Sequence, residues 1–284
     1  MFSLSIAQLS PGNDKKANLA KARLMIDQAA KDADMVVLPE MFNCPYQSDL
    51  FASFAESWPS GGTLAMLAGA ARENGVVLVG GSIPELDGDR IYNTCFVFGP
   101  DGSLLGRHRK MHLFDVRLAG GVNFQESATL TAGDEVTVLD TGKITLGLAI
   151  CYDMRFPELF RLLALQGAQL VVVPGNFNLV TGPAHWDLLA RTRAVDNQVF
   201  VAAASCARDP GAPYISYGHS LVVDPWGTVL AQAGEGEEIL RVVLPLEELS
   251  RIRASLPLLQ HRRTDLYGAF FAQLNRRKEN SHGY

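Results

Sequence analysis

The sequence lacks closely spaced cysteines. Its four cysteines are spread over 284 residues and form no C-x-x-C pair. Zinc sites and dithiol redox sites depend on such pairs, and disulfide frameworks belong to small secreted chains that are rich in cysteine. We therefore expect free thiols, no bound metal, no other cofactor and a cytoplasmic location.

Clustered positive charge and long apolar runs are also scarce. The 25 Lys and Arg residues stand against 30 Asp and Glu, and short basic runs occur only at residues 107–110 and 276–278. Nucleic-acid binding needs a clustered positive surface, so we expect no nucleic-acid partner. No stretch has the roughly 20 apolar residues that span a bilayer. The apolar residues 1–9 have no positive lead-in, which indicates a first strand rather than a signal peptide.

The chain has enough apolar residues for a large core, and strand and helix patterns alternate along it. Hydrophobic residues make up 48% of the chain and charged residues 19%. Apolar runs and helical spacing allow the elements to be assigned by residue range. Strands are expected over residues 2–9, 35–38, 76–83, 92–98, 103–106 and 144–150. Helices are expected from Asn13 or Asp14 to about residue 29, over about 63–73, and between about 152 and 166.

The second half of the chain resembles the first. Residues 35–42, Met-Val-Val-Leu-Pro-Glu-Met-Phe, resemble residues 170–177, Leu-Val-Val-Val-Pro-Gly-Asn-Phe, and residues 96–105 resemble residues 221–230. Two copies of one α-β unit pack most simply sheet against sheet, as a four-layer α-β-β-α sandwich with an internal pseudo-twofold repeat. No linker divides the chain, so we expect a single domain over residues 1–284. Its core should reach about residue 268, and a tail should cover residues 269–284.

Three apolar strands end abruptly in polar residues: Glu40, the Cys151-Tyr-Asp sequence, and Asn176. Ligand sites of α/β proteins gather at the carboxyl ends of strands, where loops leave a rigid sheet. At the position of Glu40 the second half of the chain has Gly175. A purely structural carboxylate would be needed in both halves, so this asymmetry favours a functional role for Glu40.

Cys151 is the cysteine with the most distinctive setting. It follows a buried strand and precedes a predicted helix, whose field would favour the thiolate. The other cysteines, at positions 44, 95 and 206, lack this setting and are interpreted as structural. Cysteine hydrolases usually use a histidine base, and His185 or His219 would serve on sequence alone. Each is equally explained as a polar residue bonded to the backbone.

Three segments together resemble the signatures of the nitrilase superfamily of carbon–nitrogen hydrolases, and the resemblance runs from Met1 to about Gly268. The segments are Pro39-Glu40-Met41-Phe42, His108-Arg109-Lys110-Met111-His112-Leu113 and Ile150-Cys151-Tyr152-Asp153. The resemblance implies a catalytic triad of Glu40, Lys110 and Cys151, assisted by Glu126. It also implies a homodimer or larger homo-oligomer, with contacts through the helix after Cys151 and the tail from about Gln260.

The implied chemistry is hydrolysis of a small-molecule amide. Glu40 would take the thiol proton while Cys151 attacks the amide carbon. Lys110 and a backbone N–H would stabilise the oxyanion, and Glu126 would keep Lys110 charged and oriented. The alternative for Lys110 and Glu126 is an exposed loop ion pair of little energetic value.

Within the superfamily the resemblance is greatest to omega-amidases, which hydrolyse the terminal amide of 2-oxo acids such as 2-oxoglutaramate and 2-oxosuccinamate. Deaminated-glutathione amidases are the second group. The strings that they share with this chain are partly common to both groups, so these strings discriminate poorly. The strings that favour omega-amidase are residues 42–46, 110–115, 124–127, 177–186 and 193–198. Two other classes stay open: an acyltransferase that passes the thioester to an amine, and a catalytically silent metabolite-binding protein, which the intact acid, base and thiol positions disfavour.

A 2-oxo acid carries a carboxylate, so its pocket needs a cation besides Lys110. Arg155 is the candidate. The alternative is that it pairs with Glu158 at the start of a helix. Tyr46, Phe177 and Thr181 are expected to line the rest of a small pocket.

Overall fold

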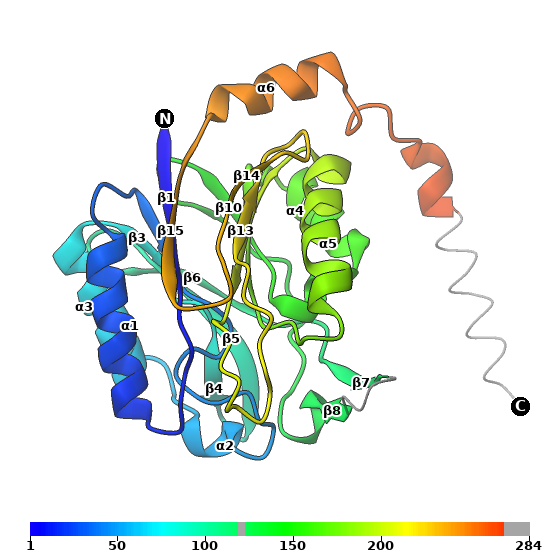
Figure 1. Cartoon of the computed structure of the whole chain (residues 1–284). Helices are drawn as coiled ribbons and strands as arrows, with labels where there is room; N and C mark the ends of the chain where they lie inside the picture. The colour runs from blue at the N-terminus through cyan, green and yellow to red at the C-terminus, as the bar shows by residue number, and fades with distance from the viewer. Residues whose placement is uncertain (119–122, 270–284) are drawn as a thin grey trace, which may run out of the picture.

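A computed structural model describes residues 1–118 and 123–269 and places two β-sheets face to face between layers of helices (Figure 1). Helices α1 (Lys15–Ala29) and α3 (Gly62–Asn74) cover the outer face of one sheet. Helices α4 (Pro157–Leu165) and α5 (Gly182–Asn197) cover the outer face of the other. The expected α-β-β-α sandwich is therefore confirmed.

The two sheets contain most of the strands. The first sheet has the order β15-β1-β2-β3-β5-β4, with β6 also paired to β5, and the second has the order β14-β13-β12-β11-β10-β9. The strands of the first sheet are β1 (Phe2–Gln8), β2 (Met35–Val37), β3 (Val77–Val79), β4 (Ile83–Asp87), β5 (Arg90–Phe98), β6 (Leu104–Arg109) and β15 (Glu238–Leu244). Those of the second are β9 (Val138–Asp140), β10 (Thr145–Leu148), β11 (Leu170–Gly175), β12 (Phe200–Ser205), β13 (Leu221–Val223) and β14 (Val229–Gln232). The remaining elements are α2 (Phe51–Phe54), the hairpin of β7 (Asp115–Arg117) and β8 (Asn123–Gln125), α6 (Leu246–Ser255), and the 3₁₀ turns η1 (Glu126–Ala128) and η2 (Cys151–Arg155).

The internal repeat is visible in the strand pairing. Along β15-β1-β2-β3-β5-β6 the successive pairs are antiparallel, parallel, parallel, antiparallel and antiparallel. The path β9-β10-β11-β12-β13-β14 has the same succession. The matching strings lie on β2 and β11, and on β5-β6 and β13-β14. The repeat predicted from the strings is therefore a repeat of topology.

Strand β2 shows how the layers form. Met35 and Val37 belong to the core between the two sheets, whereas Val36 and Leu38 pack under α1 and α3. Alternate side chains of a strand point to opposite faces. A strand covered on both faces is therefore apolar at every position, which explains the unbroken apolar run of residues 35–38.

One predicted strand is wrong in its extent. Residues 76–83 are not one strand. They contribute to two strands, β3 and β4, both of which pair with β5. The chain turns at Gly81, which has a φ of +57°, and a Cβ there would collide with the carbonyl oxygen of Pro39. Ser82 then donates its N–H to that carbonyl oxygen at 3.2 Å, and its hydroxyl accepts the N–H of Met41 at 3.1 Å. The turn thus holds the backbone on both sides of Glu40.

Other boundaries differ from the sequence expectations. Strands β7, β8 and β9 were not predicted, because each is short and lies in a polar stretch. Helix α1 begins at its predicted cap, where the Asp14 side chain accepts two backbone N–H groups. Of the expected tail, residues 270–284 lie outside the described residues. No helix in the described part of the chain is long and apolar enough to cross a membrane.

Candidate active site

The structure brings Glu40, Lys110, Cys151 and Glu126 together, at the ends of strands from both sheets. Glu40 follows β2, Lys110 follows β6, and Cys151 follows β10. Glu40, Lys110 and Glu126 are fully buried and Cys151 is 4% exposed. Because the two sheets pack face to face, residues far apart in the chain meet at one edge of the sandwich.

Lys110 lies between two carboxylates. Its Nζ donates to Glu40 Oε1 at 2.9 Å and to Glu126 Oε1 at 2.9 Å. Glu126 is held in turn by the Tyr46 hydroxyl, which donates to Oε1 at 2.8 Å, and by the Phe114 N–H, which donates to Oε2 at 2.7 Å. The Lys110–Glu126 pair is thus buried, and the alternative of an exposed loop ion pair is wrong.

Burial and charge act in opposite directions on this cluster. Burial raises the pKa of Glu40, and the positive charge of Lys110 offsets only part of the rise. For Lys110 burial lowers the pKa, but Glu126 and Glu40 outweigh it and raise the pKa well above its ordinary value. The lysine therefore stays charged over the whole physiological pH range.

The two carboxylate oxygens of Glu40 have different surroundings. Oε1 accepts from Lys110 and, at 2.9 Å, from Asn93 Nδ2. Oε2 is buried and has no hydrogen-bond partner within residues 1–118 and 123–269. A buried polar atom without a partner costs free energy, so such an atom calls for an explanation. This oxygen is available to accept a proton.

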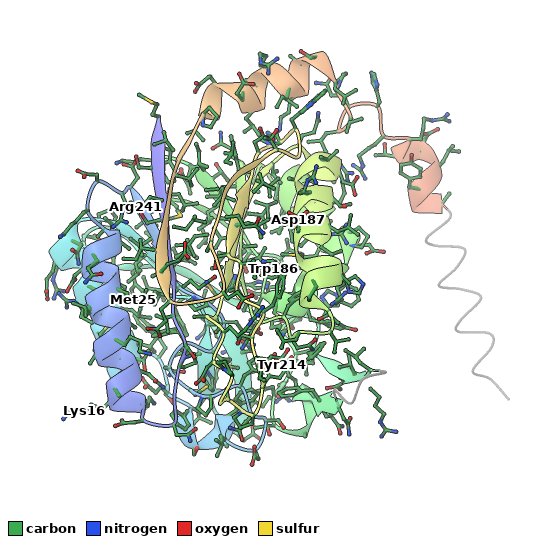
Figure 2. The ribbon with its side chains drawn as sticks, in the orientation of Figure 1. Lys16, Met25, Trp186, Asp187, Tyr214 and Arg241 are labelled. Carbon is green, nitrogen blue, oxygen red and sulfur yellow. The ribbon has the colours of Figure 1, made fainter. Side chains whose placement is uncertain are left out.

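Cys151 begins the 3₁₀ turn η2 with a φ of +47°, in the left-handed region. A residue other than glycine is strained by about 1–2 kcal/mol in this region, and such strain concentrates at functional sites. Gly175 lies beside the turn, where a Cβ would lie 3.5 Å from Cys151 Cα and 2.9 Å from the ring of Trp186, the buried residue of α5 labelled in Figure 2. The close approach of the Trp186 ring therefore explains why glycine occupies the position that Glu40 has in the first half.

The predicted thiolate at Cys151 is not supported. Helix α4 begins only at Pro157, so the thiol does not sit at its N-terminus. Burial raises the pKa of the Cys151 thiol, the negative charge of Glu40 raises it further, and Lys110 and the Asn176 N–H oppose this only in part. In the resting protein the sulfur therefore carries its proton.

Neither candidate histidine is bonded to the thiol. His185 Nδ1 lies 3.1 Å from Arg155 Nη1, and His219 Nδ1 lies 2.9 Å from the Tyr217 carbonyl oxygen. The acidic group that faces Cys151 is Glu40. The described residues contain no group of three or more His, Cys, Asp or Glu side chains arranged to hold a metal ion.

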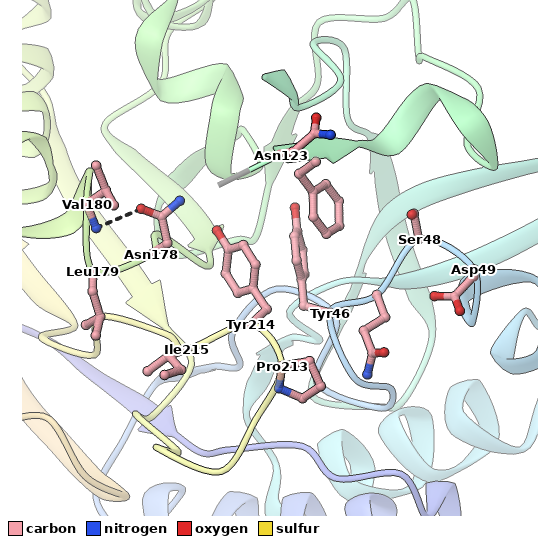
Figure 3. A pocket seen from close by; sticks show the side chains of 12 residues that line it. Tyr46, Ser48, Asp49, Asn123, Asn178, Leu179, Val180, Pro213, Tyr214 and Ile215 are labelled. Carbon is pink, nitrogen blue, oxygen red and sulfur yellow. Dashed lines mark hydrogen bonds between the residues drawn. The ribbon is translucent and has the colours of Figure 1, made fainter. Parts of the chain in front are cut away.

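A cavity of about 460 Å³ lies next to the buried cluster (Figure 3). Tyr46 and Tyr214 stand side by side in its wall, with ring centroids 4.8 Å apart. Tyr46 also bonds Glu126, and the Tyr214 hydroxyl donates to the Asn176 carbonyl oxygen at 2.8 Å. The Asn176 N–H donates to Cys151 Sγ at 3.5 Å. The two tyrosines therefore connect the cavity to the thiol and the ion cluster.

The other expected pocket residues lie outside the lining of this cavity. The Arg155 guanidinium lies 4.8 Å from the ring centroid of Phe177 and has no ion pair with Glu158 among the described residues. The Thr181 hydroxyl donates to Asn178 Oδ1 at 3.2 Å. Of the four predicted pocket residues, only Tyr46 lines the cavity.

Asn176, one of the three polar strand ends noted in the sequence, contacts Cys151. Two other polar residues of the site were missed from the sequence: Asn93 bonds Glu40, and Tyr214 lines the cavity. A signal for Asn93 exists, since it is a polar residue inside the predicted strand 92–98. Tyr214 lies in an irregular segment that gives no such signal.

Known proteins are similar to this chain over most of its length. A family model described as carbon-nitrogen hydrolase matches residues 3–254. The chain is 52% identical to omega-amidase NIT2 of Mus musculus over 94% of this chain and 96% of the relative. Its structure is similar to that of Saccharomyces cerevisiae Nit3, a member of branch 10 of the nitrilase superfamily, with a TM-score of 0.86, 45% identity and coverage of 92% and 96%. A mutant amidase from Nesterenkonia sp. AN1 with acrylamide added to its active-site cysteine gives a TM-score of 0.77, 26% identity and coverage of 95% and 100%.

The raised pKa of Cys151 gives a testable pH dependence. The thiol should stay protonated from pH 5 through its ordinary pKa of 9.0, because burial and Glu40 disfavour the thiolate. The difference in thiolate absorbance near 240 nm between the wild type and Cys151→Ser should therefore be flat across this range. A difference signal that titrates between pH 5 and 8 would show instead a thiolate stabilised by Lys110.

Proposed function

Because the chain belongs to the carbon–nitrogen hydrolase family, within the nitrilase superfamily, we propose that it is an omega-amidase. It hydrolyses the terminal amide of small 2-oxo acids, such as 2-oxoglutaramate and 2-oxosuccinamate, to the dicarboxylate and ammonia. The observation that carries the proposal is the buried cluster of Glu40, Lys110 and Cys151, in which one Glu40 oxygen has no hydrogen-bond partner among the described residues. The 52% identity to an omega-amidase over nearly the whole chain supports the substrate class.

The first proposed step is attack by the sulfur on the amide carbon. Glu40 accepts the thiol proton at Oε2 as the Cys151 Sγ–C bond forms. The raised pKa of Glu40 makes this carboxylate a stronger base than an exposed one, which compensates for the raised pKa of the thiol. The thiolate therefore exists only while it is attacking the substrate.

The second step is collapse of the tetrahedral intermediate. Lys110 Nζ and the N–H of Tyr152 stabilise its oxyanion. Glu40 returns its proton to the departing nitrogen, ammonia leaves, and a thioester on Cys151 remains.

A water molecule then completes the reaction. Glu40 removes a proton from the water as its oxygen attacks the thioester carbon. The C–S bond then breaks, and Glu40 passes this proton to the leaving sulfur, which restores the thiol and the carboxylate. Glu126 and the Tyr46 hydroxyl hold Lys110 in place throughout, since Glu126 accepts a hydrogen bond from the ammonium and is itself bonded to Tyr46. Tyr46 thus serves both the lysine and the wall of the cavity.

Recognition of the substrate carboxylate is proposed for Arg155. Its guanidinium lies over Phe177 and beside His185, and no described carboxylate pairs with it. An unpaired guanidinium is suited to bind a carboxylate through two hydrogen bonds. Phe177 and Thr181 would shape this part of the pocket. A larger substrate such as deaminated glutathione is the second candidate.

Assembly and location stay predictions from the sequence. A cytoplasmic homodimer or larger homo-oligomer is proposed, with the helix after Cys151 as one contact region. Exposed leucines at positions 162 and 165 of α4 and at position 188 of α5 support an interface on this face. The proposed contact through the tail begins at about Gln260, and its residues 270–284 lie outside the described residues. The molar mass in solution decides the oligomeric state.

Ammonia release from a substrate panel tests the proposed function. The panel contains 2-oxoglutaramate, 2-oxosuccinamate, deaminated glutathione, glutamine and a simple nitrile. We expect the two 2-oxo acid amides to give the highest kcat/KM. A kcat/KM far higher for deaminated glutathione would replace the omega-amidase proposal by the second candidate.

Lys110→Met tests the oxyanion role. The change removes the ammonium but keeps most of the side-chain volume, so kcat should fall about a hundredfold to a thousandfold, as for loss of one oxyanion donor, while KM changes less. Cys151→Ala is the control and should abolish turnover. Near-normal ammonia release by Cys151→Ala would refute the mechanism, and a Lys110→Met variant with unchanged kcat would refute the oxyanion role.

Arg155→Ala tests carboxylate recognition. Loss of a hydrogen bond to a charged group costs about 1.5–3 kcal/mol, so KM for 2-oxoglutaramate should rise roughly tenfold to a hundredfold. A neutral amide of similar length that lacks the carboxylate is the control and should be little affected. Equal losses on both amides would assign Arg155 to the support of the fold.

A further inference from the structure

Asp153 joins the segment that carries Lys110 to the turn that carries Cys151. We propose that Asp153 is a positioning residue that acts through His108 and His112, which flank Lys110, and so fixes the lysine ammonium relative to the sulfur. The proposal rests on the proposed function and adds a residue to it. Asp153 is fully buried and lies in the same 3₁₀ turn as the thiol.

All the contacts of the Asp153 carboxylate go to these two segments. Oδ1 accepts the backbone N–H of His112 at 2.9 Å and lies 2.7 Å from His112 Nδ1. Oδ2 accepts the N–H of Ile150 at 2.9 Å and lies 3.3 Å from His108 Nε2. One side chain therefore binds the residue before the thiol and the residues on both sides of the lysine.

Each histidine has a second contact that fixes its ring. His108 is buried, and its Nδ1 lies 3.1 Å from Thr137 Oγ1. The His112 ring stacks on Phe156, with centroids 3.6 Å apart and planes 8° from parallel. The imidazoles are thus rigid links between Asp153 and the lysine segment.

The backbone of Lys110 is held on its other side as well. Its N–H donates to the Asn93 carbonyl oxygen on β5 at 2.8 Å, and its carbonyl oxygen accepts the Gly133 N–H at 2.8 Å. The bond to Asn93 ties the segment to the first sheet, whereas Asp153 ties it to the turn that follows β10 of the second. Asp153 therefore fixes the position of Lys110, which follows a strand of the first sheet, relative to Cys151, which follows a strand of the second.

The network depends on an ionised carboxylate. Burial acts to raise the pKa of Asp153, but hydrogen bonds from His108 and His112 outweigh it and hold the pKa well below its usual range. A charged acceptor can satisfy the four donors at once. An asparagine would present an NH₂ group to two of them and break the link on one side.

A small displacement at this point matters for chemistry. A misplacement of about 1 Å in a catalytic site can cost about a hundredfold in rate. Loss of Asp153 should therefore affect steps that need Lys110 near the reacting oxygen. The same loss should have a much smaller effect on a thiol reaction in which no carbonyl oxygen gains charge.

Asp153→Asn tested with two thiol reagents separates these effects. Addition of Cys151 to acrylamide puts negative charge on the amide oxygen. Reaction with methyl methanethiosulfonate instead forms a methyl disulfide on the sulfur and releases methanesulfinate, so no carbonyl oxygen gains charge. We expect the acrylamide rate to fall about tenfold to a hundredfold and the thiosulfonate rate to change less than about threefold. Equal falls in both rates, or none in either, would overturn the proposal.

Two controls keep a simple folding defect apart from mispositioning. Glu85→Gln removes another buried carboxylate, which binds Arg107 and Arg109 on β6 but does not contact the cysteine turn. It should lower the melting temperature and leave the ratio of the two rates unchanged. His112→Asn keeps a donor for Asp153 near the position of Nδ1, so it should retain more acrylamide reactivity than His112→Ala.

The same assay distinguishes this proposal from the proposed substrate class. Acrylamide addition uses the thiol and needs no 2-oxo acid. If the wild type fails to hydrolyse 2-oxoglutaramate, the rate ratio still decides whether Asp153 positions the lysine. If the wild type hydrolyses it and the ratio is unchanged in Asp153→Asn, only the positioning role is lost.

Discussion

The buried ammonium of Lys110 is the constraint on which the arrangement of the site depends. A charge without solvent is tolerated only when it is paired and hydrogen-bonded. Glu40 and Glu126 supply the pairing, and Tyr46, Asn93 and the backbone N–H of Phe114 donate to these carboxylates. Among the described residues only one of the four carboxylate oxygens, Glu40 Oε2, has no hydrogen-bond partner. Residues from widely separated parts of the chain must therefore meet at one point, and the packing of two sheets face to face makes this possible.

The repeat gives the site its asymmetry. Corresponding strands β2 and β11 end at the same edge, where the first half provides Glu40 and the second provides Gly175. Glycine is favoured there because the ring of Trp186 occupies the space that a Cβ would need. The base comes from one half of the chain and the thiol from the other, and the site lies where the two halves differ.

Much of this was predictable from the sequence, and the failures have physical causes. The layers, the repeat and the grouping of Glu40, Lys110, Cys151 and Glu126 follow from apolar strands that end in polar residues and from the family resemblance. The protonation state of Cys151 was not predictable, because it depends on burial and on the distance to a carboxylate. The contacts of Asp153 also require tertiary structure, since its partners His108 and His112 lie some forty residues away in the chain.

The charge of the cavity wall bears on how a substrate carboxylate would be recognised. Its described lining includes Tyr46, Asp49 and Asn178 but no lysine, arginine or histidine. An anionic 2-oxo acid therefore finds no cation in the wall itself, and Asp49 would repel it. A carboxylate-binding group would then lie deeper or to one side. We propose Arg155 for this role, since its guanidinium lies over the ring of Phe177, the residue next to Asn178 of the wall in sequence. The entrance of the cavity would then be neutral to acidic, and the Arg155 guanidinium would lie beyond it. This cation would bind the substrate carboxylate only once the amide has come close to the thiol, and selectivity would arise at that point.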